Sequence, residues 1–309
     1  MEPYSKNILI TGATGFIGKA LAEELIRLGN YNIFCLIRDA RKAESLKGKG
    51  ACLITADLRY YESLKALDNY SLDTVVHCAA LVKNCSFKTL YPLNVKGIDN
   101  LCRWMKKSGV KNLIHISSVA VISGNDNIPL GEDLPLKAVN NYGFSKIEAE
   151  KVVKRYRSPD FNVTILRPPM VYGRGEPHLT GTIISLMRRR ILFLPGGGMN
   201  KFHLVYLKNL ISAIIFILEN QRCRNETFIV ADNEVLSSKE VFSYMARALN
   251  LPPPRAVPSF IEPLILRIPF LGGHLKRLAR DREYAIEKIK SFGFSPPYPA
   301  KDSIFQSLK

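Results

Sequence analysis

The amino-acid sequence predicts an α/β protein built around a doubly wound parallel sheet, followed by a smaller C-terminal substrate-binding region that is partly interleaved with it. Short apolar runs alternate with helical patterns through the first half of the chain. A glycine-rich turn, TGATGFIG at 11–18, joins the first apolar run to the first helical pattern. Strand–helix alternation at this spacing forms right-handed βαβ units, which place helices on both faces of a parallel sheet.

Six apolar runs are expected to form the strands. Runs this short and this apolar suit strands that are covered on both faces. They are NILI (7–10), YNIFCLI (31–37), ACLITA (51–56), DTVVHCAA (73–80), KNLIHIS (111–117) and FNVTILR (161–167). Between them, GKALAEELIRLG and LYPLNVKGIDNLCRWMKKSG repeat apolar residues on one face and close on Gly29 and Gly109. Because glycine commonly ends a helix, both stretches are predicted to be helices.

The pattern changes after residue 168, where proline and glycine cluster in RPPMVYGRG, LPGGGMN and LPPPRAVP. We expect residues 1–168 to form the main domain and residues 169–309 to form mainly a cap that contacts substrate. Segments within about 201–231 are candidates to return to the main sheet. Further helices are predicted near 179–190, 208–219 and 238–249.

The composition is that of a globular protein with an excess of positive charge. The chain has 309 residues, and its 44 basic and 27 acidic side chains give a formal charge of +17. This excess fits a solvated basic surface, an anionic cofactor or substrate, or an anionic membrane surface. We find no nucleic-acid-binding motif, so no nucleic-acid partner is expected.

The cysteines and histidines carry no metal or disulfide pattern. The six cysteines include no CxxC pair, and we interpret them as reduced thiols of a cytoplasmic protein. No signal peptide is recognisable, and no run approaches the roughly 18 apolar residues that a membrane span requires. The five histidines lack metal-ligand spacing, so no metal is expected. His178 and His203 are candidates to face substrate from the cap.

The glycine-rich turn carries the first chemical prediction. Gly12, Gly15 and Gly18 follow a predicted strand and open a predicted helix. Glycine lets a phosphate approach the backbone without a Cβ in the way, while the helix N-terminus offers free N–H groups. The spacing differs from the usual G-x-G-x-x-G, and a purely structural turn is the alternative. The position between strand and helix favours a Rossmann-type pyrophosphate site.

The end of the second strand indicates the type of cofactor. An acidic residue about 20 positions after the glycines favours NAD. Here Arg38 stands 20 residues after Gly18, and Arg41 and Lys42 follow. A guanidinium can pair with the 2′-phosphate of NADP. Asp39 could still contact the ribose, and a solvated basic turn is the alternative, but NADP is the favoured cofactor.

Tyr142 and Lys146, in NNYGFSKIEAE, form the catalytic candidate. Four residues apart on a helix, they share one face. An ammonium near a phenol stabilises the phenolate, so we expect Lys146 to lower the pKa of Tyr142 from about 10 toward neutral pH. Ser117 and Ser118 end the strand LIHISS, and a hydroxyl there could bond the substrate oxygen as charge develops on it. The set indicates acid/base chemistry between a hydroxyl and a carbonyl.

Together these residues resemble the short-chain dehydrogenase/reductase superfamily, and TGATGFIG resembles its extended branch of NAD(P)-dependent epimerases, dehydratases and reductases. The resemblance implies hydride transfer with Tyr142 as acid/base, Ser118 on the substrate oxygen and Lys146 on the nicotinamide ribose. The residues implied in cofactor binding are Gly12, Thr14, Gly15, Phe16, Ile17, Gly18, Arg38, Asp57, Leu58, Ala79, Ala80, Asn94, Ser117, Tyr142, Lys146, Pro168 and Val171. Dimers are common in this branch, so a homodimer is a candidate assembly.

Three departures from the branch concern the substrate. Sugar-nucleotide epimerases and dehydratases typically carry asparagine before VYG, where this chain has Met170. Lys208 and Asn209 stand where two aspartates are usual, and VISG at 121–124 replaces VYG after the catalytic serine. These changes weaken a UDP-sugar assignment. The form VYLKN is more similar to hydroxysteroid-dehydrogenase-like and ketone-reductase members.

Three hypotheses of function follow. The first is an epimerase or dehydratase acting on an activated sugar, and the second is an NADPH-dependent ketone reductase or hydroxysteroid-dehydrogenase-like enzyme acting on a less polar substrate. The third is a non-catalytic, cofactor-binding regulatory protein, which the intact Ser118, Tyr142 and Lys146 set argues against. The stretch FIEPLILRIPFLGGHLKRLAR at 260–280 predicts a cap helix over the substrate, or a weak peripheral contact with a membrane.

Overall fold

The structure, a computed structural model, describes residues 6–83, 85–177, 180–257 and 281–308. The apolar and basic stretch at 260–280 lies outside these residues. In the described part of the chain, no helix is long and apolar enough to cross a membrane. The chain divides into two compact units, which alternate along the sequence. Unit 1 comprises Met1–Asn125, Glu132–Pro168 and Ala213–Ile229, and unit 2 comprises Asp126–Gly131, Pro169–Ser212 and Val230–Lys309.

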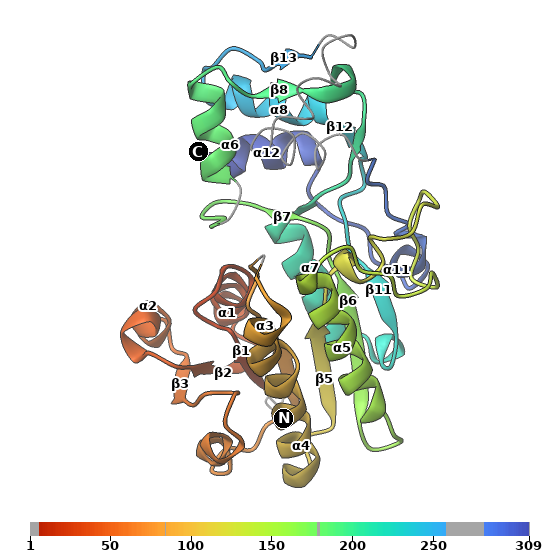
Figure 1. The fold of residues 1–309 in the computed structure, drawn as a ribbon. Helices are drawn as coiled ribbons and strands as arrows, with labels where there is room; N and C mark the ends of the chain where they lie inside the picture. The colour runs from red at the N-terminus through yellow and green to blue at the C-terminus, as the bar shows by residue number, and fades with distance from the viewer. Residues whose placement is uncertain (1–5, 84, 178–179, 258–280, 309) are drawn as a thin grey trace. The chain divides into compact units, whose positions relative to one another are not determined.

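Parallel strands form a seven-stranded sheet in unit 1 (Figure 1). Its order is β11-β6-β5-β4-β1-β2-β3. The strands are β1 (Lys6–Thr11), β2 (Tyr31–Ile37), β3 (Cys52–Thr55), β4 (Thr74–His77), β5 (Asn112–Ile116), β6 (Asn162–Arg167) and β11 (Thr227–Ile229). The six predicted runs supply β1 to β6, and the segment after 201 supplies β11, which pairs with β6. The predicted doubly wound parallel sheet is confirmed.

The winding of the sheet reverses between β1 and β4, which pair directly. From β1 the chain proceeds outward through β2 and β3, then returns to the other side of β1. Open α/β sheets bind ligands at such a switch point, outside the carboxyl ends of the strands. The fold therefore directs attention to the segments that follow β1, β4 and β5.

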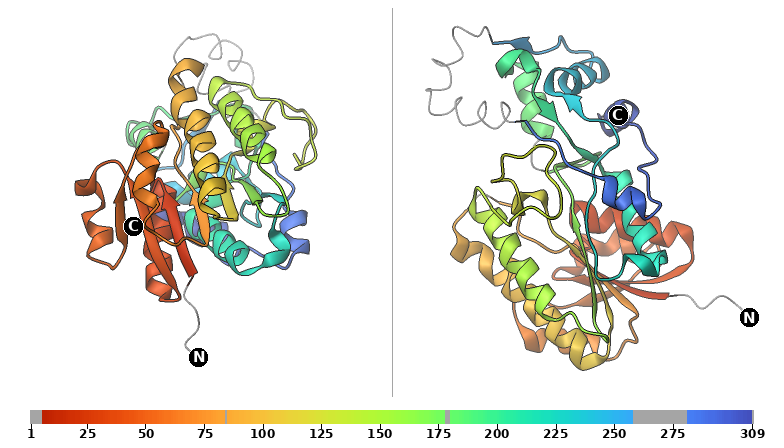
Figure 2. Two further views of the ribbon diagram at one scale, coloured as in Figure 1. Left: turned by 90° about the horizontal axis from the view of Figure 1, so that it is seen from below. Right: turned by 90° about the vertical axis from the view of Figure 1, so that its right-hand side faces the viewer.

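Helices cover both faces of this sheet (Figure 2). On one face lie α3 (Phe87–Asn94), α4 (Lys96–Ser108) and α5 (Asn141–Arg155); on the other lie α1 (Phe16–Leu28) and the part of α7 (Leu207–Glu219) that belongs to unit 1. As predicted, α1 and α4 end on Gly29 and Gly109, both with left-handed backbone. The short elements of unit 1 are η1 (Ala40–Ala43), α2 (Glu44–Lys47), η2 (Tyr61–Leu67), η3 (Val119–Val121) and η5 (Gln221–Cys223).

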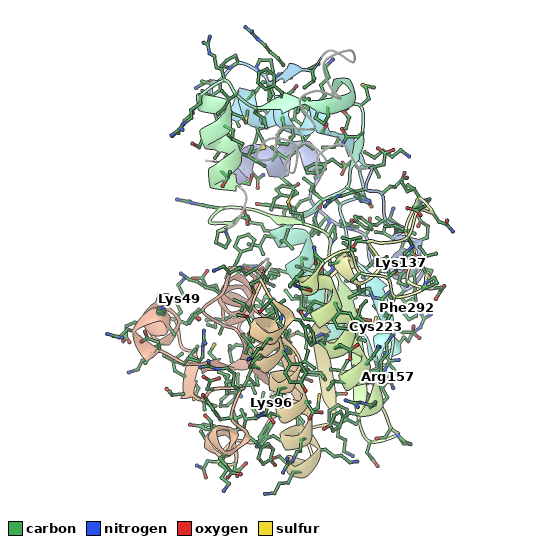
Figure 3. All side chains as sticks on the ribbon, in the orientation of Figure 1. Lys49, Lys96, Lys137, Arg157, Cys223 and Phe292 are labelled. Carbon is green, nitrogen blue, oxygen red and sulfur yellow. The ribbon has the colours of Figure 1, made fainter. Side chains whose placement is uncertain are left out.

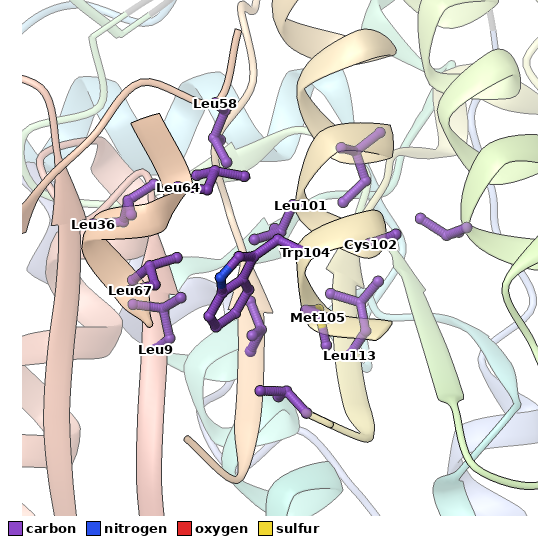
Figure 4. Packing of buried hydrophobic residues seen from close by; sticks show 14 of the residues in the cluster. Leu9, Leu36, Leu58, Leu64, Leu67, Leu101, Cys102, Trp104, Met105 and Leu113 are labelled. Atoms are coloured by element: carbon purple, nitrogen blue, oxygen red, sulfur yellow. The ribbon is translucent and has the colours of Figure 1, made fainter. Parts of the chain in front are cut away.

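A hydrophobic core of unit 1 packs between the sheet and α4 (Figure 4). Leu9 and Leu113 from the sheet belong to the same buried cluster as Leu101 of α4. Trp104, also on α4, is 2% exposed and donates its indole N–H to Asp68 Oδ1 at 2.8 Å. That hydrogen bond satisfies the indole N–H, while the rest of the Trp104 side chain contributes buried apolar area.

Unit 2 is built from short paired strands and helices around its own apolar cluster. β7 pairs with β10, β9 with β12, and β8 with β13. Phe202 and Phe242 lie in the cluster with ring centroids 6.1 Å apart. The elements are β7 (Val171–Tyr172), α6 (Thr180–Arg188), β8 (Phe193–Leu194), η4 (Pro195–Gly198), β9 (Lys201–Phe202), β10 (Val205–Tyr206), β12 (Leu236–Ser237), α8 (Ser238–Ala248), β13 (Arg255–Ala256), α11 (Glu287–Ser291) and α12 (Ala300–Leu308).

A buried ion pair ties α5 to the end of β6. Arg167 and Glu150 are 2% and 0% exposed, with Nη2 2.8 Å from Oε2 and Nε 2.9 Å from Oε1. Ser117 donates to Glu150 Oε1 at 2.6 Å, and Arg167 Nη1 donates to Glu132 O at 2.9 Å. Burial alone would raise the pKa of Glu150, but the bonds and charge of Arg167, with Ser117, hold that pKa below its ordinary value. Glu150 is therefore ionised at neutral pH.

We predict that Glu150→Gln lowers the free energy of unfolding by about 3–5 kcal/mol, because it leaves the buried guanidinium without its counter-charge. Urea unfolding measures the change. The matched control is Glu148→Gln on the same helix, whose exposed pair with Lys151 at 2.8 Å contributes about 0–1 kcal/mol. Equal losses in the two variants would contradict the prediction.

Candidate active site

The predicted site residues of unit 1 gather at the carboxyl ends of neighbouring strands. β1 leads into the turn at 11–18, β4 leads into Ala79 and Ala80, and β5 leads into Ser117 and Ser118. Because the sheet order is β5-β4-β1, these three strand ends lie side by side. The fold thereby brings together segments that are far apart in the sequence.

The glycine turn packs against the segment that follows β4. A Cβ on Gly12 would lie 2.7 Å from Ala79 N, and a Cβ on Gly18 would lie 2.3 Å from Gly12 O. Gly12 also has φ +68°, in the left-handed region that side chains disfavour. The N–H of Gly15 closes the turn by donating to Gly12 O at 2.8 Å. Backbone contact thus requires glycine at both ends of the turn.

The N-terminus of α1 offers an anion site. Gly15 is the N-cap, no side chain caps the helix, and the first turn carries no acidic residue. Thr14 and Gly15 are exposed, and Phe16 and Ile17 are half-buried. The free N–H groups and the positive end of the helix dipole therefore remain available to a ligand. These residues fit the pyrophosphate of a dinucleotide.

Charged side chains follow β2 and β3. Arg38 is exposed at the end of β2, and Asp39 Oδ1 accepts a bond from Arg41 N at 3.1 Å. Asp57, after β3, contacts Arg59 with Oδ2 and Nη2 2.6 Å apart. The hydrogen bond from Arg59 holds the pKa of Asp57 below its ordinary value, and the charge of Arg38 contributes. Arg38 therefore lies within electrostatic range of the predicted adenine contact.

Three residues predicted to bind a cofactor already make other hydrogen bonds within unit 1, and a fourth belongs to unit 2. Leu58 is 4% exposed, and its carbonyl accepts from Asn100 Nδ2 at 2.8 Å. Ser117 is 4% exposed and donates to Glu150. Pro168 is buried, and its carbonyl accepts from Val119 N at 3.1 Å. Val171, at the start of β7, belongs to unit 2. Their contacts with a cofactor stay predictions.

Asn94 is a buried link between the segment after β4 and α5. Its Oδ1 accepts from Leu81 N at 2.7 Å, and its Nδ2 donates to Ser145 Oγ at 3.0 Å. Ser145 in turn donates to Tyr142 O at 2.7 Å. One amide therefore positions the Ala79–Leu81 segment and α5 together. Ser145 was not predicted from the sequence, where its signal was a serine on the core-facing side of α5.

Ser118 and Tyr142, the two residues predicted to contact the substrate oxygen, follow β5 and open α5. Ser118 is the N-cap of η3, and its Oγ accepts from Ala120 N at 3.2 Å. That bond uses a lone pair and leaves the hydroxyl proton for donation. Hydrogen bonding by the Ser118 side chain lowers the pKa of Tyr142. Tyr142 lies in the first turn of α5, where the N-cap Asn140 accepts from Gly143 N at 2.8 Å.

Gly143 lets α5 approach the segment after Ser118. A Cβ on Gly143 would lie 2.6 Å from Ala120 O. Lys137, labelled in Figure 3, supports this segment: its N–H donates to Val121 O at 2.8 Å, and its carbonyl accepts from Gly124 N at 2.7 Å. Gly143 was not predicted from the sequence, because its role appears only when two distant backbone segments meet.

Lys146 is buried one helical turn after Tyr142. It is 2% exposed, and its Nζ donates to Ile116 O at 2.7 Å. Burial lowers the pKa of Lys146 to about 8, and the charge of Glu150 opposes that shift. The ammonium is therefore held at the carboxyl end of β5, the strand that leads into Ser118.

The expected lowering of the Tyr142 pKa was wrong for the chain by itself. Burial raises the pKa of Tyr142 to about 12, and the hydrogen bond from Ser118 offsets only part of that shift. Lys146 directs its ammonium to Ile116 O, so desolvation of the phenolate outweighs the attraction of the lysine. A phenol with this pKa is protonated at neutral pH and is ready to act as an acid.

Two buried histidines stand on the strands beside Lys146. His77 and His115 stack with ring centroids 5.4 Å apart, and His77 Nδ1 bonds Thr11 Oγ1 at 2.8 Å. Burial lowers the pKa of His77 to about 3 and that of His115 well below its ordinary value, with the charge of Lys146 contributing to both. Both rings are therefore neutral at physiological pH. They add no charge that would compete with the lysine.

Asp232 organises the polar interior of unit 2. It accepts bonds from Tyr172 Oη at 2.9 Å, Tyr206 N at 2.8 Å and Asn209 Nδ2 at 2.8 Å. Burial raises the pKa of Asp232 to about 6 despite these bonds. His203 is 3% exposed and bonds Asp232 O at 2.7 Å, which does not fit the expected substrate-facing role. His178 lies outside the described residues, and no metal-binding group of His, Cys, Asp or Glu is found among those described.

Comparison with known proteins agrees with this geometry. The model of the NAD dependent epimerase/dehydratase family matches residues 8–231. The UDP-glucose 4-epimerase of Vibrio cholerae is 30% identical over 98% of this chain and 95% of its own length. The N-acetyl-alpha-D-glucosaminyl-diphospho-ditrans,octacis-undecaprenol 4-epimerase of Escherichia coli O157:H7 is 28% identical over 98% and 94%. The crystal structure of UDP-glucuronic acid 4-epimerase from Bacillus cereus in complex with NAD shares the fold with a TM-score of 0.80, at 20% identity over 98% and 97% of the two chains.

We predict that Gly12→Ala weakens NADPH binding by at least about tenfold, because the added Cβ displaces the turn from Ala79. Fluorescence titration with NADPH measures the affinity. Gly29→Ala is the matched control: its φ is +76° but nothing lies within 4 Å of an added Cβ. Gly29→Ala should lower the free energy of unfolding by about 1–2 kcal/mol, because the backbone there is left-handed, and should leave the affinity for NADPH unchanged. Unchanged affinity in Gly12→Ala would contradict the cradle.

Proposed function

The chain belongs to the NAD dependent epimerase/dehydratase family, and we propose that it transfers a hydride between a nicotinamide cofactor and a hydroxyl-bearing carbon of an activated sugar. The observation that carries this proposal is the buried ammonium of Lys146, whose Nζ donates to Ile116 O at 2.7 Å at the end of the strand that leads into Ser118. An epimerase performs the transfer in both directions and retains its cofactor, whereas a reductase releases it. Both outcomes use the same three side chains.

Each side chain has a defined task in this proposal. Tyr142 donates its phenolic proton to the substrate oxygen in the reducing direction and removes a proton in the oxidising direction. Ser118 donates a hydrogen bond to the same oxygen as negative charge develops on it. Lys146, held by Ile116 O, favours the phenolate electrostatically whenever Tyr142 acts as a base.

The cofactor supplies or accepts the hydride when it is bound. Gly12, Gly18 and the N-terminus of α1 would hold its pyrophosphate, and Ala79 and Ala80 would line its nicotinamide side. The glycine turn supports this assignment, because a Cβ at Gly12 would collide with Ala79 N and a Cβ at Gly18 with Gly12 O, so a larger residue at either position would displace the turn.

For the type of dinucleotide we propose NADP. Arg38 supports this preference, because it is exposed at the end of β2 and a guanidinium pairs well with a 2′-phosphate. Asp39, the competing ribose contact, accepts bonds from Arg41 N and Arg41 Nε, each at 3.1 Å. The Bacillus cereus enzyme that shares the fold is described with NAD, so the preference needs a direct test.

The two relatives support a sugar as substrate, and both are named as 4-epimerases of diphosphate-linked sugars. One sugar is carried by a nucleotide and the other by undecaprenol. A second candidate is an NADPH-dependent reductase acting on a less polar ketone or alcohol. Met170 favours it, because a thioether replaces the amide that sugar-nucleotide enzymes of this branch typically carry there.

We predict that Tyr142→Phe reduces turnover by about 10²–10⁴-fold, because it removes the proton donor, while the NADPH dissociation constant stays within about threefold. Turnover of ketones is followed at the NADPH absorbance, and turnover of sugar nucleotides by chromatography of the sugar product, because an epimerase consumes no NADPH. The matched control is Tyr91→Phe, since Tyr91 is 45% exposed on α3 and lies outside the catalytic set. Full turnover in Tyr142→Phe would contradict the acid/base role of Tyr142, whereas absence of turnover in the unaltered protein would favour the regulatory, non-catalytic function.

We predict that Arg38→Ala weakens NADPH binding by about 10–100-fold, the loss of one charge-assisted hydrogen bond, and changes NADH binding less than about twofold. Paired fluorescence titrations give both constants. Arg27→Ala, near the C-terminal end of α1, is the control for removal of an exposed arginine. Tighter binding of NADH than NADPH by the unaltered protein would overturn the preference.

A further inference from the structure

One end of unit 2 is rich in exposed basic side chains. Arg188 closes α6, Arg189 and Arg190 follow it, Lys239 lies in the first turn of α8, and Arg255 lies on β13. All five side chains are exposed. Among the described residues, no salt bridge neutralises any of the five. Their positive charge is therefore available to a partner outside the chain.

Short elements of unit 2 bring these side chains to one surface. β8 begins shortly after the arginines, and its residue Phe193 lies opposite Arg255 in the pairing of β8 with β13. η4 follows β8 and contacts both β13 and α8. A Cβ on Gly198 of η4 would lie 3.0 Å from Lys239 Cβ. The end of α6, β8 and β13 lie at the same end of unit 2 (Figure 1).

Two large apolar side chains are exposed on the same surface. Ile191, which directly follows the arginines, is 44% exposed, and Met199, which directly follows η4, is 71% exposed. Exposed apolar residues are common singly, but here two of them stand among basic residues. We call the whole set the basic–apolar surface, and it consists of Arg188, Arg189, Arg190, Ile191, Met199, Lys239 and Arg255.

Acidic side chains near this surface are bound to other groups. Glu283 pairs with Lys201, and Asp281 Oδ1 accepts from Lys201 N at 2.7 Å. Glu240 Oε2 accepts from Ser237 N at 2.8 Å in the capping box of α8. These carboxylates therefore do not cancel the charge of the basic–apolar surface.

Cations interspersed with apolar side chains suit an anionic membrane. Each lysine or arginine near an anionic leaflet strengthens binding by about fivefold, and apolar side chains that enter the headgroup region add to this. A nucleic acid would attract the same cations but would leave Ile191 and Met199 without an apolar partner. The combination of both kinds of side chain favours a lipid surface.

We propose that the basic–apolar surface of unit 2 docks on an anionic lipid membrane. The five cations face the lipid headgroups, and Ile191 and Met199 enter the layer between them. This docking goes beyond the hydride-transfer function and is independent of it. The stretch at 260–280, for which the sequence predicts a membrane contact, follows β13 in the chain and is not part of this surface.

Co-sedimentation of the full chain with vesicles made of equal parts of phosphatidylcholine and phosphatidylglycerol tests the proposal. We expect binding at about 0.1 M salt. Most of it should be lost at about 1 M salt, because the Debye length falls from about 10 Å to about 3 Å. Vesicles of phosphatidylcholine alone should bind much less protein, since they carry no net charge.

The combined change Arg188→Ala, Arg189→Ala and Arg190→Ala should weaken binding to the anionic vesicles by about 100-fold, because it removes three cations from the surface. The control removes the same charge from α4 of unit 1, where three lysines are exposed. Its affinity should stay within about threefold. The control substitutions are Lys96→Ala, Lys106→Ala and Lys107→Ala.

Met199→Ser should weaken binding by about tenfold, because it removes an apolar side chain that enters the headgroup region. Val139→Ser makes a similar change at a residue of unit 1 that is 57% exposed, and its affinity should stay within about twofold. Thermal unfolding of each variant shows that it is folded. All the variants retain the stretch at 260–280, so binding through that stretch alone would leave them unaffected.

Three outcomes overturn the proposal. They are the absence of binding to the anionic vesicles at low salt, equal affinity of the arginine and lysine variants, and equal affinity of Met199→Ser and Val139→Ser. Binding to polyuridylate without binding to the vesicles would assign the cations to a nucleic acid instead. Tyr142→Phe should sediment with the vesicles as the unaltered protein does, so the fate of the hydride-transfer function is decided separately.

Discussion

Backbone contact without side chains is the constraint on which the site of unit 1 depends. The turn after β1 lies against the segment after β4, and the start of α5 lies against the segment after β5. In each place a Cβ would come within 2.7 Å of a backbone atom, at Gly12 beside Ala79 and at Gly143 beside Ala120. Because these approaches are close, the glycine turn and the segments that carry Ser118 and Tyr142 gather at one edge of one sheet. Packing by larger side chains would hold the same segments further apart.

Buried charge then fixes the chemistry at that edge. Glu150 of α5 and Arg167 at the end of β6 neutralise each other, and Ser117 donates to Glu150 at 2.6 Å. Lys146 is a further buried cation, which the Glu150–Arg167 pair does not neutralise. Its charge adds to burial in lowering the pKa values of His77 and His115, which are therefore neutral. Burial opposes every ionised form here, which explains why the phenol of Tyr142 stays protonated. The buried site therefore favours the protonated phenol of Tyr142, which can donate its proton. A positive charge beside the phenol would favour the phenolate instead.

The parts of the molecule that follow from local chemistry were predictable from the sequence. Alternating apolar runs predicted the sheet. The glycine turn together with Ser118, Tyr142 and Lys146 predicted the family and its enzyme class, which the comparisons confirm. Roles that arise from contacts between distant segments were not predictable. Ser145 and Gly143 gain theirs only when α5 meets Asn94 and Ala120. The lowered pKa expected for Tyr142 was wrong for the same reason. Residue spacing places Lys146 on the correct face of α5 but does not reveal how deeply Tyr142 is buried.

The claim that Tyr142 is the acid/base tuned by its surroundings can be tested without knowing the substrate. Ultraviolet difference titration of the protein against Tyr142→Phe isolates the phenolate signal of this residue. Without added nucleotide the account predicts a pKa of about 12 for Tyr142. With saturating NADP⁺ it predicts a clearly lower pKa, because the cationic nicotinamide favours the phenolate. The same pKa with and without the nucleotide would contradict the account.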